Sequence, residues 1–205
     1  MKKLFFCLIL IILLTSSCAT HDPFYVDKPY GFPAPYGEGS HPGIDFDIST
    51  GTPIITISDG QVIYIGEPKG PENGITVHVV HGKYFKSVYG HMSKIFVEYY
   101  QLLKRGQLIG ISGASNNYGK MDYQHLHFGI CKIGGRCSNY SETYDPNMFW
   151  LGSRPQCFNP NMDYSNYSQK DITSPIACGD YGKALIAESR RKVVKISSPC
   201  SGHEQ

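Results

Sequence analysis

The sequence predicts an all-β domain, on three observations from its central part. Apolar runs are short and alternate with polar residues, as in strands that bury one face. Turn-forming residues such as Asp59-Gly60 separate these runs, and Asp-Gly between apolar segments is a strong hairpin signal. The same region lacks the long amphipathic period that marks a helix. Many short strands with frequent turns are typical of an all-β fold.

The expected elements follow one another from the first hairpin to the end of the chain. Two strands flank the turn at Asp59-Gly60, and a further strand follows a loop that contains Gly and Pro. The expected strands cover residues 53–57, 61–65, 75–80 and 85–91, a short apolar run within 102–110, and the stretch 122–128. Residues 184–195 are expected to form one short helix with a basic face.

Length and composition fit one globular domain with extensions. The chain has 205 residues, and its 22 Gly and 13 Pro indicate many turns. Removal of residues 1–17 takes away Lys2 and Lys3 but no acidic residue, so the formal net charge falls from +2 to zero. A neutral protein lacks the basic footprint of nucleic-acid binding, and no nucleic-acid partner is expected.

The first 17 residues are predicted to be a secretory signal. Two lysines precede an apolar run, and small residues stand immediately before Cys18. This arrangement resembles the lipobox of bacterial lipoproteins, which implies a signal peptide at 1–17 and a lipid on Cys18. Residues 18–37, with several Pro and Gly, would then form a tether. An ordinary secretory peptide and an uncleaved anchor are the alternatives.

Five cysteines remain beyond the signal and Cys18, and export permits them to form disulfides. Cys131 and Cys137 flank a short turn, so a bridge across this hairpin is the expected pairing. The odd number leaves one thiol unassigned. A structural zinc site made of cysteines is less expected, because the sequence has no Cys-x-x-Cys pair.

Histidines supply the candidate functional residues. His125 and His127 project from the same face of a strand, because strand side chains alternate. Such a pair can bind one metal ion together, or one histidine can bind while the other handles a proton. His41 and Asp45 flank a turn that enters a strand and could converge across the bend. His91 lies at a strand end, where a rigid scaffold can present it to a cleft.

Four other polar residues have simpler interpretations. His78 and His81 stand in or next to a strand without partner spacing, so a structural role is expected for both. Asp59 is a turn former in the hairpin. Asp47 alternates with Asp45 and is interpreted as a solvated or turn-capping carboxylate, with an extra metal ligand as the alternative.

Three motifs together resemble the signature of lysostaphin-type (LytM-type) zinc metallopeptidases. They are His41-Pro42-Gly43-Ile44-Asp45, Tyr89-Gly90-His91-Met92 and His125-Leu126-His127-Phe128, and the likeness covers about residues 38–150. The resemblance implies a two-sheet antiparallel β architecture of the LytM (duplicated hybrid motif) type with a narrow active-site groove. It also implies one Zn²⁺ per domain, bound by His41, Asp45 and His127, with His91 and His125 as catalytic residues whose separate tasks stay open.

The resemblance further implies a function and a place. The function is zinc-dependent endopeptidase hydrolysis of peptide cross-links in bacterial peptidoglycan, with a zinc-activated water and a histidine general base. Peptidoglycan peptide stems are the expected partners, and a lipid anchor would hold the protein in the cell envelope, at the periplasmic face of the outer membrane. By family analogy the cross-link joins D-Ala to meso-diaminopimelate, with glycine bridges as the alternative.

Two other functions compete with this interpretation. One is a non-catalytic envelope protein that binds peptidoglycan or regulates another cell-wall hydrolase, and the other is a secreted peptidase. In domain terms, residues 38–151 are the expected metallopeptidase domain and residues 152–205 a cysteine-containing extension. The loop at 116–124 is longer and more polar than is usual in the family, which bears on substrate preference.

Overall fold

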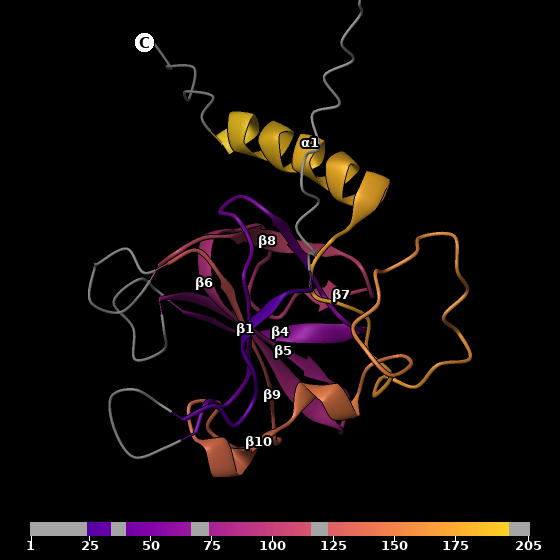
Figure 1. Ribbon diagram of the computed structural model, residues 1–205. Helices are drawn as coiled ribbons and strands as arrows, with labels where there is room; N and C mark the ends of the chain where they lie inside the picture. The colour runs from indigo at the N-terminus through magenta and orange to yellow at the C-terminus, as the bar shows by residue number, and fades with distance from the viewer. Residues whose placement is uncertain (1–23, 34–39, 67–73, 116–122, 197–205) are drawn as a thin grey trace, which may run out of the picture.

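The computed structural model describes residues 24–33, 40–66, 74–115 and 123–196 (Figure 1). The expected signal peptide, Cys18 and Cys200 lie outside these residues, as do half of the expected tether and most of the loop at 116–124. Within the described part of the chain, no helix is long and apolar enough to cross a membrane.

The strands form one antiparallel hydrogen-bonded network, whose main path is β1-β2-β9-β6-β5-β4-β7. Off this path, β10 pairs with β9, and β8 pairs with both β6 and β3. The strands are β1 Val26–Lys28, β2 Ile44–Phe46, β3 Pro53–Ile55, β4 Gly60–Gly66, β5 Ile75–His81, β6 Phe85–Ile95, β7 Leu102–Leu103, β8 Leu108–Ser112, β9 Leu126–Cys131 and β10 Thr143–Tyr144. The 3-10 helices η1 Tyr140–Glu142 and η2 Pro146–Met148 and the helix α1 Gly179–Ile196 complete the fold. The predicted antiparallel β fold is confirmed.

Strand β6 connects the two sheets. Its first half pairs with β9, with Gly90 opposite His127, and its second half pairs with β8, with Met92 opposite Ser112. The two expected sheets therefore share this strand. The change of partner falls at His91, where β6 also has an extra residue relative to β5 and forms a bulge. His91 has a φ of 58°, a left-handed conformation that is strained for a residue other than glycine.

The main hydrophobic core lies behind the histidines of β9. Leu126 and Phe128 are fully buried, and they alternate along the strand with His125 and His127 as the sequence predicts. The Phe128 ring packs against Tyr89 of β6 and stacks on Trp150, with ring centroids 5.7 and 5.8 Å away. This packing gives β9 a fixed register and so fixes the direction in which its histidines project.

Both ends of the described chain are built into this framework. In β1, which belongs to the expected tether, Val26 lies opposite Phe46 and Lys28 lies opposite Asp45. At the other end, the Thr173 amide donates to the Ile57 carbonyl at 3.2 Å. Parts of the tether and of the extension thus pack on the expected metallopeptidase domain, whose boundaries stay predictions.

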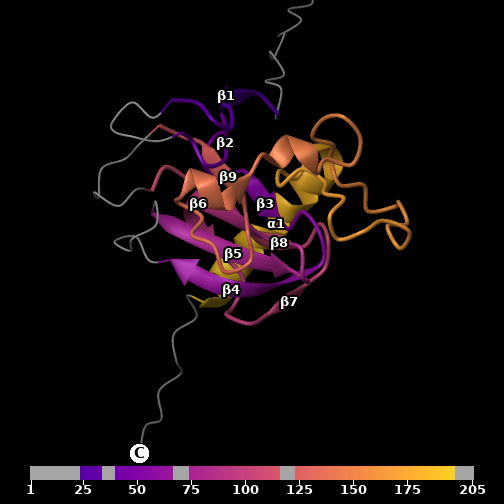
Figure 2. The same cartoon turned by 90° about the horizontal axis from the view of Figure 1, so that it is seen from below.

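The C-terminal segment also contributes to the core. Ile172 and Ile176 are 0% and 1% exposed within the main cluster. Helix α1 places Leu185 against Ile55 and Leu108 in a second cluster, at the end of the molecule opposite β10 (Figures 1 and 2). The helix begins at Gly179, five residues before the predicted start at residue 184. In this added part of the helix, Tyr181 packs on Phe158.

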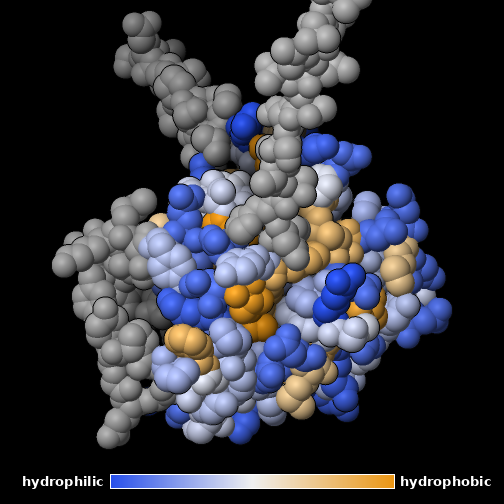
Figure 3. All heavy atoms as spheres, viewed as in Figure 1, coloured by the Kyte–Doolittle hydropathy of each residue, from blue (hydrophilic) through white to orange (hydrophobic). Residues whose placement is uncertain are grey.

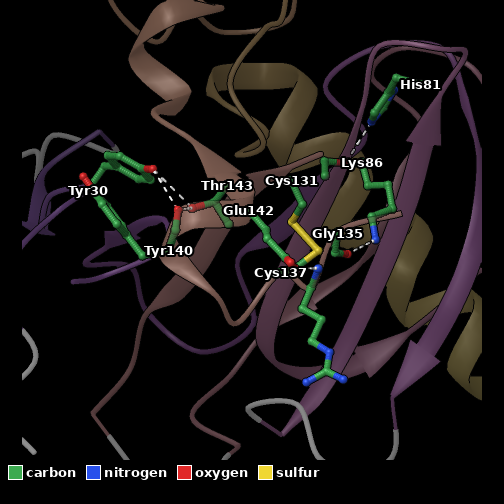
Figure 4. The surroundings of a disulfide bond; sticks show 11 residues. Tyr30, His81, Lys86, Cys131, Gly135, Cys137, Tyr140, Glu142 and Thr143 are labelled. Carbon is green, nitrogen blue, oxygen red and sulfur yellow. Dashed lines mark hydrogen bonds between the residues drawn. A yellow bond between two sulfur atoms is a disulfide. The ribbon is translucent and has the colours of Figure 1, made fainter. Parts of the chain in front are cut away.

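Two disulfides are present in the described residues. One joins Cys131 of β9 to Cys137 across the short turn, inside which Lys86 Nζ donates to the Gly135 carbonyl at 2.7 Å (Figure 4). The other joins Cys157 to Cys178, a pair that sequence reasoning did not select. It closes a loop of the extension immediately before α1, and so restrains the segment that carries Ile172 and Ile176.

Both histidines of β5 are buried and have structural surroundings. One ring nitrogen of His81 lies 2.9 Å from the Asp59 carbonyl and the other 2.8 Å from Ser87 Oγ. The His78 ring lies against Tyr64, with centroids 4.7 Å apart. Burial lowers the pKa of each histidine to about 4. On the face seen in Figure 3, hydrophilic residues surround patches of apolar residues.

The first prediction concerns the extension. Replacement of Ile176 by Ala should lower the free energy of unfolding by about 2–5 kcal/mol, because a fully buried side chain leaves a cavity. The matched control is Ile133→Ala, at a site 50% exposed, which should change it by less than about 0.5 kcal/mol. Urea denaturation measures the free energy of unfolding of both variants. Equal changes in the two would show that the extension does not complete the core.

The second prediction concerns pH. A histidine with a folded-state pKa of about 4 and an unfolded value of 6.5 stabilises the fold fully above pH 6.5, and this stability is lost as pH falls toward 4. His78→Phe keeps a ring beside Tyr64 but removes the titration. Urea denaturation at pH 7 and pH 5 should therefore show a smaller loss of stability for the variant. An unchanged loss would mean that His78 does not contribute to the acid sensitivity.

Candidate metal centre

Three ligand atoms converge at the end of β2. His41 Nε2 lies 3.1 Å from Asp45 Oδ1, His127 Nδ1 lies 2.9 Å from the same oxygen, and the two nitrogens are 3.0 Å apart. Ligands of a tetrahedral zinc ion lie about 2.0–2.1 Å from the metal and hence about 3.3 Å from one another. The nearly equal separations fit such a site. Two imidazoles and one carboxylate are also a donor set that zinc binds with its fourth position open.

The fold brings the three residues together through strand pairing. Asp45 lies in the middle of β2, directly opposite His127 of β9. His41 reaches the same point from the turn before β2, and this turn needs glycine at position 43. A Cβ added to Gly43 would lie 2.5 Å from the Phe128 carbonyl oxygen and 2.8 Å from His127 Cε1. In this motif, close packing requires Gly43, whereas the chemistry of the site requires His41 and Asp45.

Asp45 stays ionised in this environment. The residue is 4% exposed, and burial raises the pKa of its carboxyl group. Hydrogen bonds and charge interactions with His127 and His41 outweigh the burial and hold the pKa well below its usual range. The cluster thus keeps a permanent negative charge, because the groups that lower the pKa of Asp45 are the other members of the cluster.

The tautomer of His41 suits a metal ligand. His41 Nδ1 lies 3.2 Å from the Pro29 carbonyl oxygen, which can only accept a hydrogen bond. Nδ1 can therefore keep its proton on this carbonyl when Nε2, the nitrogen that faces Asp45 and His127, binds a metal ion. A backbone contact of this kind also orients the ring, as partners of metal-binding histidines commonly do.

A second pair of histidines lies beside the first group. The rings of His91 and His125 are 4.1 Å apart, and His125 Nε2 lies 3.9 Å from Asp45 Oδ2. His91 Nδ1 donates to the Ser115 carbonyl at 2.6 Å and His125 Nδ1 to the Tyr123 carbonyl at 2.8 Å. Both rings are therefore Nδ1–H tautomers with Nε2 as the available acceptor. Burial, with smaller contributions from His125 and His127, lowers the pKa of His91 to about 4 and keeps it neutral.

The structure thus brings five sequence-predicted residues into one place. His41, Asp45 and His127 form the group that could hold a metal, and His91 and His125 lie next to it. Asp47 is not part of the ligand group among the described residues. His78 and His81 lie apart from the cluster in β5, where His78 contacts Tyr64 and His81 contacts Ser87.

Two residues near Asp45 were missed by sequence reasoning. Tyr123 donates its hydroxyl hydrogen to Asp45 Oδ2 at 3.2 Å, and Lys28 Nζ lies 2.5 Å from the same hydroxyl oxygen. Tyr123 stands two residues before His125, so the strand period could have indicated that both face the site. Lys28 had no sequence signal, because its position depends on the pairing of β1 with β2.

Comparison with known proteins agrees with this geometry. Residues 39–140 match the profile described as Peptidase family M23. The chain is 38% identical over 90 residues to the peptidoglycan DD-endopeptidase ShyB of Vibrio cholerae, across 44% of this chain and 20% of that protein. It is 37% identical over 107 residues to the glycyl-glycine endopeptidase ALE-1 of Staphylococcus capitis, across 49% of this chain and 28% of that protein.

A solved structure shows the same fold. The catalytic domain of lysostaphin from Staphylococcus simulans superposes with a TM-score of 0.54 at 28% identity, over 62% of this chain and 91% of that domain. The chain spans 28% or less of the two curated relatives named above, so the likeness is that of one domain. All five clustered residues fall within the matched segment, whereas Lys28 precedes it. Residues 39–140 therefore carry the likeness to peptidase family M23.

Proposed function

We propose that this protein is a zinc-dependent endopeptidase that cleaves peptide bonds in bacterial peptidoglycan. The observation that carries the proposal is the convergence of His41 Nε2, Asp45 Oδ1 and His127 Nδ1 beside two further histidines. The match of residues 39–140 to peptidase family M23 supports peptidase activity. The relatives named as a peptidoglycan DD-endopeptidase and a glycyl-glycine endopeptidase support the substrate class.

Each clustered residue has a task in this proposal. His41, Asp45 and His127 would hold the ion. Bound zinc would supply a Lewis acid and would make a water molecule easier to deprotonate. His91 and His125, through Nε2, take a proton from the attacking water, return it to the departing amine and stabilise the charge that develops on the carbonyl oxygen. The Ser115 and Tyr123 carbonyls keep both rings in the required tautomer.

The proposed bond is the peptide cross-link between D-Ala and meso-diaminopimelate. The similarity to a DD-endopeptidase supports it, but the glycyl-glycine endopeptidase is similar to nearly the same extent, at 37% against 38% identity. Glycine bridges therefore enter the test as the second substrate.

Catalytic action also needs the buried, neutral His91, whose contacts with Ser115 and His125 support a chemical role.

The third prediction tests activity. The full chain loaded with zinc should release uncross-linked muropeptides from purified sacculi, as detected by mass spectrometry. His127→Ala should abolish release and zinc uptake together, because a ligand is lost. His91→Ala should retain stoichiometric zinc yet lower the rate by about 10²–10⁴-fold, because a proton-transfer group is lost. Removal of zinc with a chelator should stop the reaction, and added zinc should restore it.

The matched control is His78→Phe, which removes a buried histidine outside the cluster and should leave the rate unchanged. Sacculi with DD cross-links and sacculi with glycine bridges are compared in the same assay, so the cleaved bond is identified from product masses. Intact cross-links in both, with zinc bound at one ion per chain, would contradict the endopeptidase. That outcome would favour a protein that binds peptidoglycan or regulates another hydrolase.

The fourth prediction concerns location. We propose a lipid on Cys18 that anchors the protein at the periplasmic face of the outer membrane, on the basis of the small residues that precede Cys18 after an apolar run. Cys18→Ser should then move the protein from the membrane fraction to the soluble fraction of the cell envelope. Cys200→Ser serves as the control. An unchanged distribution of the Cys18 variant would contradict the anchor.

A further inference from the structure

Asp45 uses its two carboxylate oxygens for different purposes. Oδ1 faces the ligand nitrogens of His41 and His127, at 3.1 and 2.9 Å. Oδ2 accepts the hydrogen bond of the Tyr123 hydroxyl at 3.2 Å. A carboxylate fixed at one oxygen presents the other to a metal in a single orientation. The contact from Tyr123 therefore bears on how Asp45 can bind an ion.

Lys28 fixes the direction of this hydrogen bond. Its Nζ lies 2.5 Å from the Tyr123 hydroxyl oxygen, and an ammonium group can only donate. The hydroxyl oxygen thus accepts from Lys28, and its single hydrogen is left for a carboxylate. Lys28 Nζ itself is 3.8 Å from Asp45 Oδ2, beyond a hydrogen bond, so its effect on the ligand passes mainly through Tyr123.

Two carboxylates can accept the Tyr123 hydrogen, those of Asp45 and Asp27, and the buried one is favoured. A tyrosine hydroxyl keeps its hydrogen at neutral pH. Asp27 is exposed and Asp45 is 4% exposed. A buried carboxylate oxygen loses more than an exposed one when it has no donor, because water cannot replace the bond.

Tyr123 also contacts the second pair of histidines. Its ring stacks on His125, with centroids 4.2 Å apart and planes inclined by 14°. Its carbonyl oxygen accepts the hydrogen bond from His125 Nδ1 at 2.8 Å. One residue therefore touches both the ligand Asp45 and the neighbouring His125. The stacking needs an aromatic ring, whereas the contact with Asp45 needs the hydroxyl, and this difference allows the two to be separated by substitution.

The strand order explains why these residues meet. Across β1, β2 and β9, Lys28 lies opposite Asp45, and Asp45 lies opposite His127. Tyr123 approaches from just before β9. Lys28 comes from a segment outside residues 39–140, so the added strand β1 brings a charged group to the edge of the metal centre. The Lys28 ammonium also lies 4.4 Å from the Tyr123 ring centroid, a second contact that holds the ring in place.

We propose that Tyr123 is a positioning residue that orients Asp45 for metal binding, and that Lys28 acts on Asp45 through the Tyr123 hydroxyl. The inference rests on the proposed function only for the identity of the metal. The hydroxyl holds Oδ2, and Oδ1 then faces the two histidine nitrogens. Loss of such an outer hydrogen bond typically weakens metal binding by about 10–100-fold.

The fifth prediction is tested by zinc affinity, measured on the full chain by competition with a chromophoric chelator. Tyr123→Phe keeps the ring on His125 and removes the hydroxyl, so affinity should fall about 10-fold or more. Lys28→Met keeps the length of the side chain and should lower affinity by a smaller factor. The double variant should bind zinc as Tyr123→Phe does, because Lys28 acts through a hydroxyl that is already absent.

The control is Tyr99→Phe, at an exposed tyrosine away from the site, which should bind zinc like the unaltered chain. Thermal unfolding without metal should show that each variant is still folded at the temperature of the zinc measurement, which separates positioning from a general loss of structure. Unaltered affinity in Tyr123→Phe would overturn the role of Tyr123, and additive losses in the double variant would overturn that of Lys28. Zinc binding without cleavage of sacculi would refute the proposed function alone, since the affinities are measured without substrate.

Discussion

A buried carboxylate organises the whole site. Asp45 is almost inaccessible to water, and an ionised group in such a place is stable only when surrounding groups compensate its charge. His41 reaches it from the preceding turn, His127 from the neighbouring strand, and Tyr123 from the approach to that strand. The contacts with His127 and His41 hold the pKa of Asp45 low against the effect of burial. The positions of β2 and β9 and the charge state of Asp45 therefore depend on each other.

Strand β6 serves a different purpose. It changes partner from β9 to β8 at His91, and the left-handed backbone there is held by ladders on both sides. Strain at a functional position persists only where surrounding structure over-determines it. The Ser115 carbonyl then fixes the ring through Nδ1. Rigid strands thus present His91 and His125 side by side, whereas a loop would leave their relative position free.

Much of the fold and the site could be predicted because the relevant patterns are local. Strand alternation put His125 and His127 on one face, and the turn between His41 and Asp45 suggested convergence. Lys28 could not be predicted, since it meets Asp45 only through the pairing of β1 with β2. The Cys157–Cys178 bridge spans 21 residues without a hairpin pattern. Ile172 and Ile176 stand in a segment without strand periodicity, so nothing local marked them as core residues.

The burial of Ile172 and Ile176 has a consequence for the order of events during synthesis. The core contains residues from β2, near the start of the described chain, and from this segment near its end. Contacts so distant in sequence form slowly, because a long loop must close before they stabilise the fold. A ribosome that has made the five clustered residues, up to His127, has not yet made the segment that completes the core behind them. The fold is therefore finished only after Ile176 has been made.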